Sequence, residues 1–484
     1  MMKLFILTLL LITMPPAIAA QKPVPTQPHI GVDQRVELMA IIFRLAGSRE
    51  YNQGKLQPYV SEIDRHFGPF REHEAIKLAT EMREKMGFGY DTVMYLAVNM
   101  NNIRDLEERV PFDAAGGLLR EHGLSEQQAQ QFAGVIRKFL TAARAFVVDS
   151  KASEFFAAHQ KFYDAADDRL HAIVTKYADF SWFDRFYGKP PAADFFVVPL
   201  LANSETNFGP RVPGLGMRQE LYAVLTTSRT DAAGFPVYDE DKVGTLVHEF
   251  SHSFVNPLVE SYKAQFTPPA EKILAPVKEA LREQGYGSAH LLVIESVVRA
   301  ATARYILAHK GAKQAQEEVV DQQGKGYFHL PELFDLLGEY ERERKKYPTF
   351  ESFMPRIVAF FGDFAGRVET VKAAYDAKRP KVVSLSIENG AKDVDPNLTE
   401  ILVRFDRPMR KSLPTLNYDL RGPRNRFPEI GKFEFDEQGT AFRISVKLQP
   451  GRDYEIFLNR HSGGNFAGPD GILLAPYQIY FRTR

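Results

Sequence analysis

The sequence predicts an α+β protein, in which a mainly helical domain with a small sheet is followed by an all-β domain. Apolar side chains recur at helical spacing from residue 32 to 177 and again from 288 to 377. Two short runs rich in β-branched and aromatic residues, 194–201 and 220–227, lie between these helical stretches. From residue 382 the pattern changes to short alternating strands separated by turn residues.

The N-terminus predicts export. Residues 1–20 combine a positive start at Lys3, an apolar run over 4–14 and a small-residue cleavage site, which is typical of a signal peptide. We expect cleavage near residue 20 and a secreted or periplasmic protein with no later membrane span. The expected domains are the signal peptide, a helical domain over 21–379 and a β-domain over 380–484.

Composition excludes several function classes. The chain has 484 residues with 61 basic and 61 acidic side chains, so no net charge recruits nucleic acid or an anionic membrane. It contains no cysteine, which excludes a lipid-anchored lipobox, disulfides, thiol catalysis and cysteine-ligated zinc. With 44% hydrophobic residues, packed cores of two or three domains are expected.

The helical stretch up to residue 177 predicts one lobe and no repeat array. Helical periodicity is clearest in segments 36–43, 75–82 and 132–140. Glycine and proline residues break the pattern at 68–69, 87–89, 110–111 and 116–117. Residues 180–186 hold the only tryptophan among several other aromatics. Their density favours packing between lobes, with a substrate subsite as the alternative.

Pro199 should confine the first β-rich run to a sheet edge or place the proline at the end of its strand. A glycine- and proline-containing loop over 207–216 separates the two runs.

The most informative stretch covers residues 245–254. His248 and His252 lie four residues apart, so on a helix both rings project from one face and reach one metal ion. Glu249 points to the side, where a carboxylate acts on water as a general base. Apolar residues at helical spacing predict the helix, and Asn256 with Pro257 is expected to end it.

This HExxH segment, with uncharged residues around its histidines, resembles the metal helix of zincin metallopeptidases. No glycine and third histidine follow His252 at metzincin spacing, so the resemblance is to a gluzincin-like site. It implies a zincin-like fold with a small antiparallel sheet. One of the two predicted strands would be the edge strand, which offers backbone groups to an extended substrate. The whole stretch from 32 to 377 is similar to a family of exported bacterial HExxH proteins.

A catalytic zinc ion (Zn²⁺) takes three protein ligands, so a third is needed. The gluzincin resemblance implies a glutamate on a later helix, and Glu295 lies within the nearly all-apolar segment 288–310. A buried carboxylate needs compensation, which a metal ion provides. Arg299, one turn later, offers an ion pair instead or in addition. Glu260 is the first substitute as ligand, and His290 is a further one.

The tail predicts a β-sandwich of about one hundred residues. Segments 390–396 and 401–409 are similar to bacterial Ig-like domains that are appended to secreted enzymes and surface proteins. The resemblance implies a module that spaces, stabilises or docks the catalytic domain and contacts protein or glycan.

The expected function is zinc-dependent hydrolysis of peptide bonds in peptide or protein substrates, with His248, His252 and Glu295 as ligands and Glu249 as general base. Three side chains are candidates to stabilise the oxyanion, namely Tyr305, Tyr327 and His329. The alternative is a non-catalytic, zinc-containing binding or structural protein at the cell envelope. Glu249 favours the peptidase, because a structural metal needs no base beside its ligand.

Overall fold

The computed structural model describes residues 27–112, 126–188, 193–212, 218–412, 414–418, 426–461 and 463–484. The predicted signal peptide and the predicted break at 116–117 lie outside these residues. Within the described part of the chain, no helix is long and apolar enough to cross a membrane.

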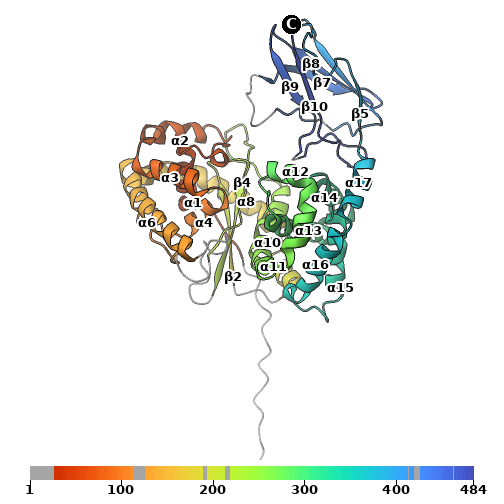
Figure 1. The fold of residues 1–484 in the computed structure, drawn as a ribbon. Helices are drawn as coiled ribbons and strands as arrows, with labels where there is room; N and C mark the ends of the chain where they lie inside the picture. The colour runs from red at the N-terminus through yellow and green to blue at the C-terminus, as the bar shows by residue number, and fades with distance from the viewer. Residues whose placement is uncertain are drawn as a thin grey trace, which may run out of the picture.

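An N-terminal helical lobe forms one side of the molecule (Figure 1). Its helices are α1 (Gln34–Leu45), α2 (Tyr59–Phe67), α3 (Glu74–Met86), α4 (Asp91–Val98), α6 (Glu126–Asp149), α7 (Ala152–Ala158) and α8 (Gln160–Tyr177). Nearly every residue of α1 is buried, so this helix forms the centre of the lobe. Asp33 caps its start by accepting a hydrogen bond from the Arg35 amide.

A four-stranded sheet lies between this lobe and a second helical lobe (Figure 1). Its strands are β1 (His29–Ile30), β2 (Ala193–Leu200), β3 (Arg211–Val212) and β4 (Gln219–Thr226), in the order β1-β2-β4-β3. Side chains on one face of β2 and β4 belong to the core of the N-terminal lobe, and those on the other face to the core of the second lobe. Each helical lobe therefore covers one face of the sheet.

The expected antiparallel sheet is wrong, because β2 and β4 pair in parallel over their full lengths. Only β3 runs antiparallel to β4. The physical reason lies in burial: strands covered on both faces carry nearly continuous apolar runs, as parallel strands do, instead of an alternating pattern. The predicted edge strand is also wrong, since β2 and β4 are the two inner strands. Pro199 is the next-to-last residue of β2, where a strand tolerates proline.

The second lobe is built around α13 (Ala289–Lys310), which is buried along most of its length. The surrounding helices are α9 (Ser181–Tyr187), α10 (Asp241–Ser261), α11 (Lys263–Leu274), α12 (Lys278–Glu283), α14 (Ala312–Gly324), α15 (Leu330–Arg342), α16 (Phe350–Ala365) and α17 (Val368–Lys378). The aromatic helix α9 packs Phe183 against Phe250 and Phe254 of α10. These aromatic residues therefore have a packing role, but they lie in the core of the second lobe and not, as was predicted, between the two lobes.

The predicted end of the histidine-bearing helix at Pro257 is wrong, because α10 continues to Ser261. Proline lacks the N–H of one helical hydrogen bond. Burial offsets this loss, because Val259 is fully buried after the proline. Packing of the last turn therefore outweighs the helix-breaking tendency of one residue.

The C-terminal region is all-β. A four-stranded antiparallel sheet has the order β5-β6-β8-β7, and a two-stranded sheet pairs β9 with β10. The strands are β5 (Val382–Leu385), β6 (Glu400–Phe405), β7 (Glu429–Phe435), β8 (Ala441–Lys447), β9 (Asp453–Phe457) and β10 (Gln478–Arg482). Apolar side chains of both sheets share one core. The predicted change from a mainly helical to an all-β region is confirmed.

Candidate metal centre

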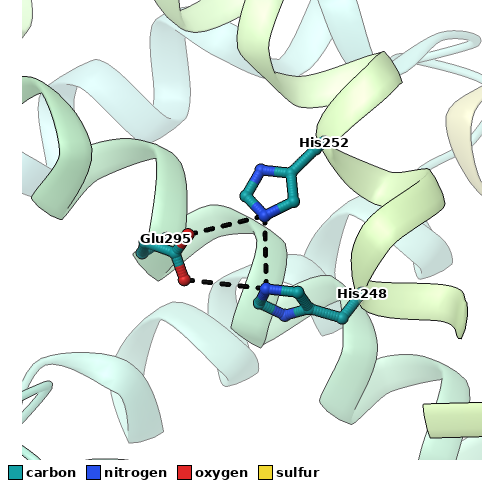
Figure 2. A group of neighbouring side chains, drawn as sticks. All are labelled: His248, His252 and Glu295. Atoms are coloured by element: carbon teal, nitrogen blue, oxygen red, sulfur yellow. Dashed lines mark hydrogen bonds and ion pairs between the residues drawn. The ribbon is translucent and has the colours of Figure 1, made fainter. Parts of the chain in front are cut away.

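Two helices bring His248, His252 and Glu295 together. The histidines project from one face of α10, and Glu295 projects toward them from α13 (Figure 2). The two Nε2 atoms lie 3.2 Å apart. The Glu295 oxygens lie 3.4 Å from His252 Nε2 and 3.7 Å from His248 Nε2. Among the described residues, these three form a group in which each side chain offers one ligand atom, close enough together to hold a metal ion.

The spacing of these atoms fits a zinc ion. Zinc–nitrogen and zinc–oxygen bonds of about 2.0–2.2 Å at tetrahedral angles place neighbouring ligand atoms roughly 3.3–3.5 Å apart. The separation of the two Nε2 atoms, 3.2 Å, lies close to that range, and each imidazole has one Glu295 oxygen nearby, Oε1 at 3.4 Å from His252 and Oε2 at 3.7 Å from His248. Two imidazoles and one carboxylate also leave the fourth tetrahedral position for water or substrate.

Further side chains hold two of the three groups, His252 and Glu295, in place. His252 Nδ1 lies 3.2 Å from the Asn256 side-chain oxygen, which favours a proton on Nδ1 and leaves the Nε2 lone pair for a metal. Arg299 forms an ion pair with Glu295 at 2.8 Å. Arg299 also donates to the Gln322 side-chain oxygen at 2.6 Å. The predicted ion pair and the predicted approach of Glu295 to the histidines therefore occur together.

The electrostatics of the centre favour metal ligation. Burial, followed by the charges of His252 and Arg299, lowers the pKa of His248 well below its usual value, so this ring is neutral. Burial also raises the pKa of Glu249, and the carboxylates of Asp91 and Glu295 add to the rise. A divalent cation beside Glu249 would oppose that rise by stabilising its ionised form.

The centre opens into a cavity of about 1510 Å³. Both helical lobes line it: α10 contributes Glu249, and the start of α4 contributes Asp91 and Thr92. The N-terminal lobe is therefore a wall of the cavity. Asp91 is reached by solvent, yet protein surrounds it closely enough to raise its pKa to about 6. His252 opposes that rise and Glu295 adds to it.

The segment before β3 forms another wall. Phe208 exchanges two backbone hydrogen bonds with Val224 of β4, at 3.0 and 2.8 Å. In an extended segment the neighbours of such a residue face the other way, so the backbone groups of Asn207 and Gly209 turn away from β4. Both residues line the cavity. Gly209 lies so close to α10 that an added Cβ would be 2.4 Å from the Glu249 carbonyl oxygen.

The alternative ligands lie elsewhere in the same cavity. Glu260 forms ion pairs with Lys263 at 3.0 Å and with His290 at 3.3 Å. Neither Glu260 nor His290 belongs to the group formed by His248, His252 and Glu295.

The three oxyanion candidates are placed differently. Tyr305 lines the cavity, and its hydroxyl accepts a hydrogen bond from the Asp179 amide. Tyr327 and His329 are fully buried and do not line it. His329 instead contacts the Ser296 hydroxyl at 2.6 Å.

Several residues of the site were not predicted. Asp91, Tyr90 and Tyr286 line the cavity, and Gln322 holds Arg299. Their only sequence signal is the turn at 87–89, which precedes Tyr90 and Asp91. Because Tyr90, Asp91 and Gln322 belong to other helices or loops and Tyr286 lies in the loop before α13, spacing within the two ligand helices could not identify them.

Comparisons with known families agree with the two-part architecture. A model described as a domain of unknown function (DUF4932) matches residues 29–360, and a bacterial Ig-like domain model matches residues 376–483. No curated protein and no solved structure matches the chain. The DUF4932 model matches more than half of the residues of this chain. The chain therefore belongs to the DUF4932 family and carries a C-terminal bacterial Ig-like domain.

Proposed function

We propose that this protein is an exported, gluzincin-like zinc metallopeptidase. The observation that carries the proposal is the convergence of His248, His252 and Glu295 within zinc-ligand distances of one another. Glu249 lies between the two histidines in sequence and would be the general base that a hydrolase needs. It lines the adjoining cavity. The predicted signal peptide supports a secreted or periplasmic location.

The chain's own groups divide the work of hydrolysis. His248, His252 and Glu295 would hold the ion, and Arg299 and Asn256 would orient two of them. When bound, zinc supplies Lewis acidity, which polarises a carbonyl group and acidifies water. The Glu249 carboxylate takes a proton from the attacking water and later passes it to the leaving amine.

We further propose that peptide or protein substrate lies extended along residues 206–211. The outward-facing backbone groups of Asn207 and Gly209 offer hydrogen bonds to a substrate backbone. Pairing with an extended substrate was predicted for one of the two long strands, and we assign it instead to this short segment beside β4. Tyr305 is the one of the three oxyanion candidates that lines the cavity.

Replacement of the general base tests the proposal. Glu249→Gln keeps the shape of the side chain and removes its basicity, so we expect loss of casein hydrolysis by roughly 10²–10⁴-fold. Zinc content should stay at about one per chain, as in the wild type. Glu260→Gln is the matched control, because Glu260 lines the same cavity outside the ligand group.

Two results would contradict the peptidase proposal. Zinc-loaded wild-type protein that cleaves neither casein nor a broad peptide library would favour a non-catalytic envelope protein. Equal hydrolysis by wild type and Glu249→Gln would remove Glu249 from the mechanism.

A further inference from the structure

The Ig-like domain touches the helix that supports the metal centre. Leu473 packs on Gly324, the last residue of α14, where an added Cβ would lie 2.6 Å from Leu473 Cδ1. Two glycines of the same domain approach this helix end at similar range: a Cβ on Gly471 would lie 3.2 Å from Val320, and one on Gly463 would lie 3.3 Å from Lys325. Backbone and side chains thus meet at three points.

The linker fixes the same loop of the Ig-like domain. Arg379, between α17 and β5, donates hydrogen bonds of 2.9 Å to the carbonyl oxygens of Leu473 and Leu474. Leu473 is 3% exposed, although it is absent from the apolar core of its own domain, to which Leu474 belongs. Its burial therefore comes from the contact with the helical domain.

The end of α14 that contacts the Ig-like domain carries Gln322, which is linked to the metal ligands through Arg299. Gln322 is two residues before Gly324, and its side-chain oxygen accepts the 2.6 Å hydrogen bond from Arg299. Its side-chain nitrogen donates to Glu318 at 2.8 Å, which fixes the orientation of the amide. Arg299 in turn pairs with Glu295. Lys325, in contact with Gly463, also lines the cavity.

We propose that Gln322 is a positioning residue for the metal ligand Glu295 and that the Ig-like domain supports it by holding the end of α14. The inference rests on the proposed zinc site. Arg299 also lies over the rings of Tyr286 and Tyr327, so loss of the Gln322 oxygen removes one of several contacts that orient it. A less well-oriented Arg299 in turn leaves Glu295 less well oriented. The Ig-like domain thereby contributes to metal affinity without contacting the ion.

Zinc affinity of the full-length chain, measured by competition with a chromophoric chelator, tests the role of Gln322. Gln322→Met keeps length and apolar volume but removes the acceptor, so the zinc dissociation constant should rise on the order of tenfold. The pair Gln322→Glu and Glu318→Gln keeps an acceptor for Arg299 and exchanges the donor and acceptor between positions 318 and 322, so it should return the constant to near the wild-type value. Equal dissociation constants for wild type and Gln322→Met would overturn the assignment.

Two neighbouring leucines test the role of the Ig-like domain. Leu473→Ala removes the contact with α14 and should raise the zinc dissociation constant on the order of threefold. Leu474→Ala removes a similar side chain from the core of the same domain and should leave the constant unchanged. Equal effects of the two substitutions would contradict the proposed support, because they would reflect general destabilisation.

A double-mutant cycle shows whether the support runs through Gln322. In a Gln322→Met background, Leu473→Ala should have no further effect on zinc affinity, whereas additive effects would reject the proposed route. Zinc bound with the expected affinities but without hydrolysis would refute the peptidase proposal alone. A wild-type chain that binds no zinc would refute both proposals.

Discussion

Glu295 joins the two halves of the candidate centre. It lies between the imidazoles of α10 and the guanidinium of Arg299, and its side chain is 5% exposed. A carboxylate buried to this extent needs positive charge nearby. Arg299 supplies one such charge, and the two histidine nitrogens turned toward Glu295 leave a position for a second.

Removal of this carboxylate separates the possible ligands. Glu295→Ala should release zinc on dialysis, because two imidazoles alone do not complete a catalytic site. Glu260→Ala should retain about one zinc per chain, since Glu260 is paired with Lys263 and His290 away from the ligand group. Metal analysis after dialysis measures both. Full occupancy in Glu295→Ala would show that the third ligand is another residue.

At the scale of elements, the position of α10 depends on close contact with the segment before β3. Gly209→Ala would place a methyl group 2.4 Å from the Glu249 carbonyl oxygen, which belongs to the backbone of α10 and cannot easily move away. We expect destabilisation of about 1–3 kcal/mol together with reduced hydrolysis. Gly244→Ala is the control, because its Cβ would meet nothing within 4 Å and alanine favours helix.

Urea unfolding and casein hydrolysis measure the two glycine variants. Gly244→Ala should be as stable as the wild type or slightly more so. If Gly209→Ala matched the wild type in both measurements, the contact between this segment and α10 would not matter for the site.

Helix type and position were more predictable than strand pairing. The buried run around Glu295 and the motif around His248 each have helical periodicity. The sequence therefore predicted α13 and α10, and it predicted which face of each helix carries the metal ligands. Pairing of β2 with β4 depends on the path of the chain between them, which composition does not specify. The extension of α10 past Pro257 depends on tertiary packing in the same way.

At the scale of the whole molecule, the N-terminal lobe is tied to the sheet by a buried carboxylate. Glu37 of α1 is fully buried and accepts hydrogen bonds from the Leu201 amide, just after β2, and from the Tyr59 hydroxyl. Burial raises its pKa from 4.5 to about 7, although these hydrogen bonds and His159 oppose the rise. No single segment of the sequence could predict this contact, because it joins residues 164 positions apart.

This carboxyl group should make stability depend on pH. The folded state keeps the Glu37 proton up to about pH 7, whereas the unfolded state loses it near pH 4.5. The free energy of unfolding should therefore fall by about 3 kcal/mol between these pH values. Glu37→Gln should lack this component. Urea unfolding at pH 5 and pH 7.5 measures it, and identical pH dependence in both proteins would contradict the prediction.

The division of the molecule also explains which site residues were predictable. The sequence indicated His248, Glu249, His252 and Glu295 because a motif or an isolated charge marks each within its own helix. Asp91 reaches the cavity from the other lobe, so only the fold reveals its place.

Zinc K-edge X-ray absorption of the full-length chain, loaded with one equivalent of zinc, tests the central claim most directly. The account predicts two imidazole nitrogens and oxygen ligands at about 2.0–2.2 Å in a four-coordinate site. A spectrum with no imidazole ligand or only one, or a chain that retains no zinc, would contradict the assignment of His248, His252 and Glu295.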